Sequence, residues 1–154
     1  MRKILALLVA AIAAYYGHDR LDLGGSPGPA PSGPAGPSGG AAAPTADAIE
    51  RAFAERRSDV QVEGDGVVVK VLPDDDDGSR HQKFILRLPS GQTVLVAHNI
   101  DLAPRVPSLA EGDRIGFFGE YEWNDRGGVV HWTHHDPAGR HVGGWLRRGN
   151  KKYE

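Results

Sequence analysis

The chain has no cysteine. This absence excludes disulfides, thiolate metal sites, a cysteine nucleophile and an anchor through an acylated cysteine. Any bound metal must therefore be held by histidine, aspartate or glutamate. The chain also lacks a large excess of positive or negative charge, since its formal net charge is only −2 at pH 7. Its overall electrostatics consequently give no reason to bind nucleic acid or an anionic membrane.

Long hydrophobic runs are also lacking. The apolar run over residues 4–16 is shorter than the ~20 residues that a membrane-spanning helix needs. Arg2 and Lys3 precede it, and Ala11 and Ala13 supply the small-residue pattern of a cleavage site. We predict a secretory signal peptide over residues 1–23, the alternative being an uncleaved membrane anchor through residues 4–16. Both place the domain outside the cytoplasm, in the periplasm or attached to the membrane.

Residues 24–44 consist almost entirely of glycine, proline, serine and alanine. Such a stretch cannot bury enough apolar surface to offset the entropy of ordering it, so we predict a disordered linker. The remaining residues, 45–154, are enough for one small domain.

The domain is predicted to be mainly β. Capping residues and an apolar face predict one short helix over Thr45–Arg57. Alternating patterns separated by turn residues predict five strands, the first bent at Gly64–Gly66, and then a small carboxyl-terminal hairpin through Gly149 and Asn150. The strand count and rhythm match a five-stranded, OB-like β-barrel, a fold known for binding oligonucleotides and oligosaccharides.

The stretch Ile115–His141 is the most informative, because it holds five aromatic residues and four of the seven histidines. It predicts two strands joined by the turn Asn124–Gly128. In the second strand, Val130, Trp132 and His134 are expected to continue the alternation of the first.

Histidines and an aspartate near the end of this stretch form the first candidate site. Imidazole and carboxylate groups are suitable ligands for a divalent metal such as zinc. The alternative is that these side chains make ordinary hydrogen bonds at the rim of the sheet. The candidates are His131, His134, His135, Asp136 and His141, of which the last three are the better geometric group.

Aromatic and basic residues form the second candidate site. Seven of the eleven aromatic residues fall within the last forty positions, together with a cluster of arginines and lysines. Aromatic faces beside cations are what a single-stranded nucleic acid or a glycan would contact, although a small domain also needs aromatics in its core. The candidates are Tyr121, Trp123, Trp132, Arg140, Trp145, Arg147, Arg148, Lys151 and Lys152.

His98 and Asp101 are further polar candidates. His98 has the same parity as Val94 and Val96, which predicts a partly buried histidine that bonds to a backbone carbonyl or to Asp101. If it faced a cleft instead, it could act as a general base.

Three segments carry a resemblance to a known family: HQKFILRLPSGQTVLVAHNIDLAPRV, GDRIGFFGEYEWN and GGVVHWTHHDPAGRH. Over residues 48–154 the chain resembles a bacterial family catalogued as a domain of unknown function, the 3465 family, and the His131–Asp136 segment is distinctive. The resemblance implies a small exported or membrane-tethered bacterial protein with an architecture similar to the predicted barrel. It implies no established activity.

The sequence therefore favours a domain that binds an extended polymer, with single-stranded DNA or RNA ahead of a cell-wall glycan. The alternative is a metal-dependent, nuclease-like hydrolase that uses the His131–His141 cluster. A periplasmic protein–protein interaction module is a third hypothesis. The oligomeric state does not follow from the sequence.

Overall fold

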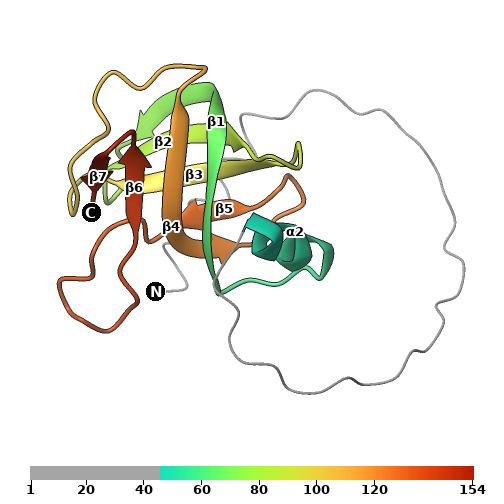
Figure 1. The fold of residues 1–154 in the computed structure, drawn as a ribbon. Coiled ribbons are helices and arrows are strands. Elements are labelled where there is room, and N and C mark those ends of the chain that lie inside the picture. The colour runs from blue at the N-terminus through green and yellow to red at the C-terminus, as the bar shows by residue number, and fades with distance from the viewer. Residues whose placement is uncertain (1–45) are drawn as a thin grey trace, which may run out of the picture. The chain divides into compact units, whose positions relative to one another are not determined.

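The structure is a computed structural model that describes residues 46–154 (Figure 1). The signal peptide or anchor predicted over residues 1–23 and the linker predicted over residues 24–44 lie outside the described residues. No helix among residues 46–154 is both long and apolar enough to cross a membrane.

The described part contains one α-helix and seven strands. The helix, α2, spans Ala46–Ala54 and buries Ile49 and Ala52 against the core, as the pattern over Thr45–Arg57 predicted. The strands are β1 (Val60–Asp75), β2 (His81–Arg87), β3 (Thr93–Asn99), β4 (Arg114–Glu122), β5 (Val129–His131), β6 (Trp145–Arg148) and β7 (Lys151–Tyr153).

Five of these strands close into a ring in the order β1-β2-β3-β5-β4. All the pairings around the ring are antiparallel except that of β3 with β5, which is parallel. The hairpin β6–β7 extends the sheet from the edge of β4. The predicted fold class is confirmed: it is mainly β, with five strands in an OB-like order, one short helix and a carboxyl-terminal hairpin.

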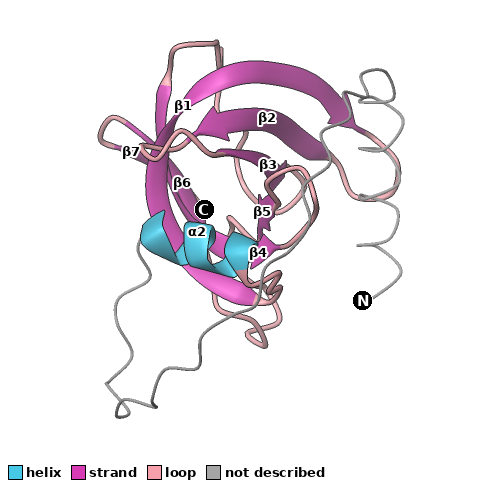
Figure 2. Ribbon diagram, turned by 90° about the vertical axis from the view of Figure 1, so that its right-hand side faces the viewer, coloured by secondary structure: helices cyan, strands magenta, loops and turns pink. Residues whose placement is uncertain are grey.

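Strand β1 bends around the ring and pairs with two other strands (Figure 2). Its first half, from Val60 to Val67, pairs with β4, and its second half, from Val67 to Asp75, pairs with β2. At the changeover, a Cβ on Gly66 would lie 2.8 Å from the carbonyl oxygen of Arg87. Only glycine allows this close approach of two backbones, and the bend predicted within one long strand is confirmed.

The core fills the ring with side chains from alternate strand positions. On β4, Ile115, Phe117 and Tyr121 are fully buried, and Phe84 and Val96 are buried opposite them on β2 and β3. Each such side chain contributes roughly 1.5–3 kcal/mol relative to an exposed one. The alternation leaves the intervening residues of β4 on the opposite face of the strand.

The alternation expected through Val130, Trp132 and His134 is wrong. Strand β5 ends at His131, and Trp132 has a φ of 53°, which takes the chain out of the sheet. The chain returns as β6 beside the same strand β4. A Cβ on Gly144 would lie 2.1 Å from the carbonyl oxygen of Trp132, so the two ends of this excursion meet. We call residues 132–144 the inserted loop.

Candidate functional site

The outward face of β4 carries Gly116, Phe118, Glu120 and Glu122, because the residues between them point into the core. Strand β6 pairs with β4 at Gly116–Phe118, and β5 pairs with it at Glu120–Glu122. The two neighbours therefore lie end to end along one edge of β4. This arrangement divides the outward face into an aromatic half and an acidic half.

In the aromatic half, Trp145 stacks with Phe118 at a ring-centroid distance of 6.3 Å. The guanidinium of Arg147 lies 5.6 Å from the Trp145 ring centroid, and Nζ of Lys152 lies 5.3 Å from it. Arg147 and Lys152 are cross-strand partners in the β6–β7 hairpin. We call Phe118, Trp145, Arg147 and Lys152 the basic aromatic face.

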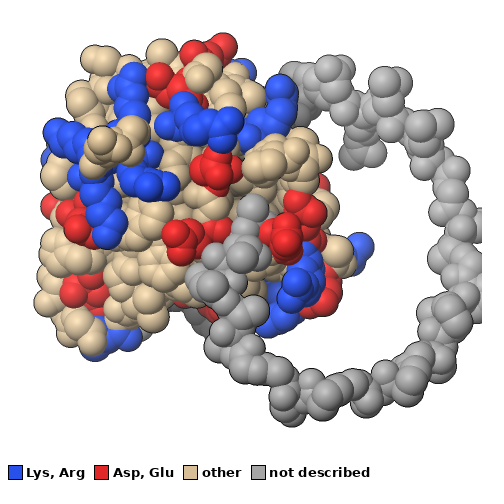
Figure 3. All heavy atoms as spheres, viewed as in Figure 1, with Lys and Arg blue, Asp and Glu red and all other residues tan. Residues whose placement is uncertain are grey.

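The positive charges of this hairpin are only partly neutralised. Arg148 pairs with Asp113 at 3.0 Å, and Lys152 pairs with Glu154 at 2.9 Å. Among residues 46–154, no carboxylate lies within ion-pair distance of Arg147 or Lys151, both of which are exposed. Figure 3 shows basic side chains gathered over the β6–β7 side of the molecule.

In the acidic half, His131 on β5 is the direct register partner of Glu120. Its Nε2 lies 3.5 Å from Oε1 of Glu120 and 3.8 Å from Oε1 of Glu122. One potential ligand atom from each of these three residues lies within 4.8 Å of the other two. We call Glu120, Glu122 and His131 the acid–histidine cluster. Its side chains are between 10% and 20% exposed.

The electrostatics of the cluster favour charged forms on both sides. Burial is the largest influence on the pKa of His131 and lowers it, but the carboxylates of Glu120 and Glu122 together outweigh burial and raise the pKa. The His131 ring in turn lowers the pKa of both carboxylates. Glu122 also raises the pKa of Asp59, an exposed residue just before β1.

The inserted loop brings a second histidine to Glu120. Nε2 of His141 lies 2.7 Å from Oε2 of Glu120, and its Nδ1 lies 2.7 Å from the carbonyl oxygen of Val142. The His141 ring stacks on Trp132 with centroids 4.0 Å apart and planes 9° apart. Glu120 is therefore flanked by one histidine on each of its two oxygens.

Asp136 organises the inserted loop through its carboxylate. Its oxygens accept hydrogen bonds from the backbone N–H groups of Ala138, Arg140 and His141 at 2.9, 2.7 and 2.9 Å. His134 is buried and donates from Nδ1 to the carbonyl oxygen of His135 at 2.8 Å. These contacts account for the positions of both side chains without a ligand.

Of the five histidine and aspartate candidates, only His131 belongs to the one group of three or more potential ligands that the described residues form. His141 borders this group through Glu120, whereas His135 is exposed. Glu120 and Glu122 were not among the site residues predicted from the sequence. Their spacing of two residues puts them on one face of a strand. Counting across the predicted turn Asn124–Gly128 pairs His131 with Tyr121, one residue away from its actual partner Glu120.

The candidate binding residues separate into several environments. Tyr121 is fully buried, its hydroxyl donates to the carbonyl oxygen of Gly127 at 3.2 Å, and burial raises its pKa to about 12. It therefore belongs to the core and not to a surface. Trp123 packs against the core beside Arg56, Trp132 stacks on His141, and Arg140 is exposed on the inserted loop. Trp145, Arg147 and Arg148 all lie on β6.

His98 is fully buried and serves the fold. Its Nε2 donates to the carbonyl oxygen of Pro104 at 3.1 Å, and the Thr133 hydroxyl lies 2.8 Å from its Nδ1. Burial lowers the pKa of His98 to about 4. It thus ties β3 to the start of the inserted loop and does not face solvent as a general base would.

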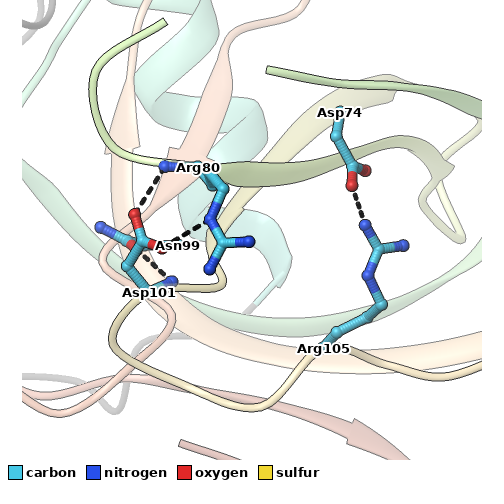
Figure 4. Close-up of polar contacts among 5 residues, drawn as sticks. All are labelled: Asp74, Arg80, Asn99, Asp101 and Arg105. Atoms are coloured by element: carbon cyan, nitrogen blue, oxygen red, sulfur yellow. Dashed lines mark hydrogen bonds and ion pairs between the residues drawn. The ribbon is translucent and has the colours of Figure 1, made fainter. Parts of the chain in front are cut away.

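Asp101 forms an ion pair with Arg80 (Figure 4). Its oxygens accept from the backbone N–H and from Nε of Arg80, both at 2.8 Å, while its own N–H donates to Oδ1 of Asn99 at 2.9 Å. The same view contains the ion pair of Asp74 with Arg105. These contacts fasten the segment after β3 to the segment around the β1–β2 connection.

No curated protein matches this chain. A family described as "Protein of unknown function (DUF3465)" matches residues 40–154, a range that includes all seven strands, the inserted loop and both halves of the outward face of β4. This match agrees with the resemblance carried by the HWTHHD segment. Because it covers well over half of the sequence, the chain belongs to the DUF3465 family, whose function is unknown.

Proposed function

We propose that the domain binds single-stranded nucleic acid across the basic aromatic face. The observation that carries this proposal is the arrangement around Trp145, whose ring has the cationic groups of Arg147 and Lys152 at 5.6 and 5.3 Å. Both cations come from a paired hairpin, so the positions of their Cα atoms are set by the strand register and not by a flexible loop.

Stacking and charge supply the affinity in such a surface. A base that stacks on an aromatic side chain contributes roughly 1–3 kcal/mol, and every base can stack, so the surface does not need a defined sequence. Arg147 and Lys151 have no carboxylate partner among the described residues, which leaves them available to neutralise phosphates. Arginine can also stack on bases through its planar guanidinium.

The charge of the hairpin favours nucleic acid over a neutral glycan. A glycan needs aromatic platforms but gains little from four basic residues within six positions, Arg147, Arg148, Lys151 and Lys152. The β1–β2 connection, which OB-type proteins often use for nucleic acid, is unsuitable here, because it holds the exposed aspartates Asp76 and Asp77. A polymer with negative charge would therefore lie over β6–β7.

Binding can be measured by fluorescence anisotropy with a labelled oligothymidine at low salt. We expect Trp145→Ala to weaken binding about 5- to 100-fold. Arg147→Gln should weaken it several-fold and reduce the slope of log K against log salt by about 0.7, the value for one lost phosphate contact on a single strand. The matched control is Arg51→Gln, an equal charge change on the exposed side of α2.

Two outcomes count against this proposal. One is an affinity that is the same in Trp145→Ala and Arg147→Gln as in the unchanged protein. The other is tight, salt-independent binding of a neutral glycan oligomer with no binding of oligothymidine, which would move the function to the glycan class.

We also propose that the domain acts outside the cytoplasm. The support is the basic start and apolar run of residues 1–23, which are typical of an export signal. Cell fractionation of the full chain and of a chain without residues 1–23 tests this localisation. Retention of both forms in the cytoplasm would contradict it.

The acid–histidine cluster favours a second candidate function, a metal-dependent hydrolase. A hydrolase of this kind is possible only if the domain binds a metal ion. The residues that would form the metal site in the structure differ from the predicted group of His135, Asp136 and His141.

A further inference from the structure

The acid–histidine cluster contains one of the two buried side-chain polar atoms in the described residues that have no hydrogen-bond partner. Among residues 46–154, the buried side-chain nitrogens without a hydrogen-bond partner are Nε2 of His131 and Nε2 of Gln61. His131 is the register partner of Glu120 on β5, and Gln61 is its register partner on β1. Buried polar groups are normally satisfied. Of the two, only the ring nitrogen of His131 can bind a metal ion, because the Gln61 amide nitrogen is an N–H donor. The unpaired Nε2 of His131 beside two carboxylates therefore indicates that something else belongs at this place.

The distances in the cluster fit a metal ion better than direct hydrogen bonds. Nε2 of His131 lies 3.5 and 3.8 Å from the oxygens of Glu120 and Glu122, too far for strong charge-assisted hydrogen bonds, which are shorter than about 3 Å. A tetrahedral ion with ligands at about 2.1 Å separates its ligand atoms by about 3.4 Å. The two distances from Nε2 of His131, 3.5 and 3.8 Å, are thus close to the spacing that an ion between these ligands would produce.

We propose that Glu120, Glu122 and His131 bind one divalent transition-metal ion, with zinc or manganese as the ions that suit the site. One imidazole and two carboxylates are hard to intermediate ligands, which suit these metals and not copper(I). Calcium takes six to eight oxygen ligands, so the imidazole counts against it.

The ligands are held by rigid elements. Glu120 and Glu122 are two residues apart on β4, and His131 is fixed against them by the antiparallel register of β5. His141 acts as a positioning residue, because its Nε2 contacts Oε2 of Glu120 at 2.7 Å and leaves the other oxygen directed toward His131. Such outer partners orient ligands, and their loss typically weakens metal binding 10- to 100-fold.

Three protein ligands leave a coordination position open, as in catalytic zinc sites. Glu120 follows Phe118 by two residues on the same face of β4, about 7 Å along the strand. The ion would therefore lie beside the basic aromatic face. Metal binding itself does not depend on nucleic-acid binding, and the two can be measured separately.

The test uses the full chain purified without an affinity tag and stripped with EDTA. We expect about one equivalent of zinc or manganese to bind in calorimetry and to raise the melting temperature by several degrees. Cobalt should give the visible absorption of an ion bound by nitrogen and oxygen ligands. Calcium should leave the melting temperature unchanged.

Substitutions assign the ligands. Glu122→Gln and His131→Gln should each abolish the cobalt spectrum, while His141→Gln should bind the same equivalent about 10- to 100-fold more weakly. His135→Gln is the matched control, since His135 is exposed and outside the cluster, and it should bind as the unchanged protein does. If a variant is poorly folded, Glu120→Asp provides a second test, because it keeps the charge and shortens the ligand.

The proposal would be overturned by an absence of binding for all transition metals, since the cluster would then be a metal-free ion pair. Binding that survives in both Glu122→Gln and His131→Gln would also overturn it. So would binding that is lost in His135→Gln, which would move the site to the inserted loop.

Discussion

His131 and Glu120 face each other as direct cross-strand partners, with 3.5 Å between Nε2 of His131 and Oε1 of Glu120. The second oxygen of Glu120 contacts His141 at 2.7 Å. One carboxylate on β4 therefore connects β5 to the far side of the inserted loop. This relationship explains why the histidine-rich segment, which leaves the sheet after His131, still lies against the outward face of β4.

The inserted loop depends on a close approach at Gly144. A Cβ there would lie 2.1 Å from the carbonyl oxygen of Trp132 and 2.3 Å from that of Phe118. Backbone atoms cannot easily move away, so we expect Gly144→Ala to lower the free energy of unfolding by about 3 kcal/mol. Gly139→Ala is the comparison, because no atom lies within 4 Å of its Cβ position and only its φ of 62° is unfavourable.

Urea unfolding of both variants checks this prediction. Gly139→Ala should cost only about 1 kcal/mol. Equal losses of unfolding free energy in the two variants would show that Gly144 does not lie in close contact with the backbone of Trp132.

Asp136 should control the order of the same loop. Its carboxylate accepts three backbone N–H groups, so Asp136→Ala should speed hydrogen exchange at Ala138, Arg140 and His141. These hydrogen bonds lower the pKa of Asp136. The protection is therefore complete above the ordinary aspartate pKa and is lost only as the pH falls through the lower folded value. Asp136→Asn keeps one acceptor oxygen and should lose less protection.

His98 should make stability depend on pH. Burial lowers its pKa from 6.5 to about 4, so between these values the unfolded chain binds a proton that the folded chain does not. Stability is thus fully present above pH 6.5 and falls as the pH drops toward 4. Between pH 7.5 and 5 the loss should be about 2 kcal/mol.

Comparing the unchanged protein with His98→Gln isolates this contribution, because all other titrating groups remain. The variant should be less stable at pH 7.5 but should lose less stability on going to pH 5. The same pH dependence in both proteins would contradict the assignment of a neutral, buried His98.

Gln82 should hold the long connection between β3 and β4. Its buried amide donates to the carbonyl oxygen of Val106 and accepts from the Val106 N–H, both at 3.0 Å. Gln82→Ala leaves both buried backbone groups unpaired and should cost about 2–4 kcal/mol in thermal or urea unfolding. Gln92→Ala removes one longer bond of 3.3 Å to Gly127 and should cost less than about 1 kcal/mol.

The fold could be predicted from local signals because those signals repeat in β proteins. The alternation of apolar and polar residues predicted the strands around Phe84, Val96 and Phe117, and the turn residues Gly149 and Asn150 predicted the final hairpin. The failure at Trp132 has a local cause. An aromatic residue normally favours a strand, but here a positive φ turns it out of the sheet, and no pattern in a single sequence reveals such a conformation.

The site was predictable only in part for a different reason. Clustered histidines indicate a possible site in the sequence, because histidine is rare, whereas Glu120 and Glu122 resemble ordinary solvent-exposed strand residues. Their importance comes from register, which sets Glu120 opposite His131, and from the return of the inserted loop with His141. Long-range contacts of this second kind depend on the closed fold and have no local sequence signal.

Nucleic-acid binding at the basic aromatic face can be followed through the fluorescence of Trp145 alone. The chain has three tryptophans, so the Trp123→Phe, Trp132→Phe double variant retains only this one. Titration with an unlabelled oligothymidine at low salt should quench its emission saturably, and added salt should reverse the quenching. Emission that stays constant throughout the titration would show that nucleic acid does not bind at Trp145.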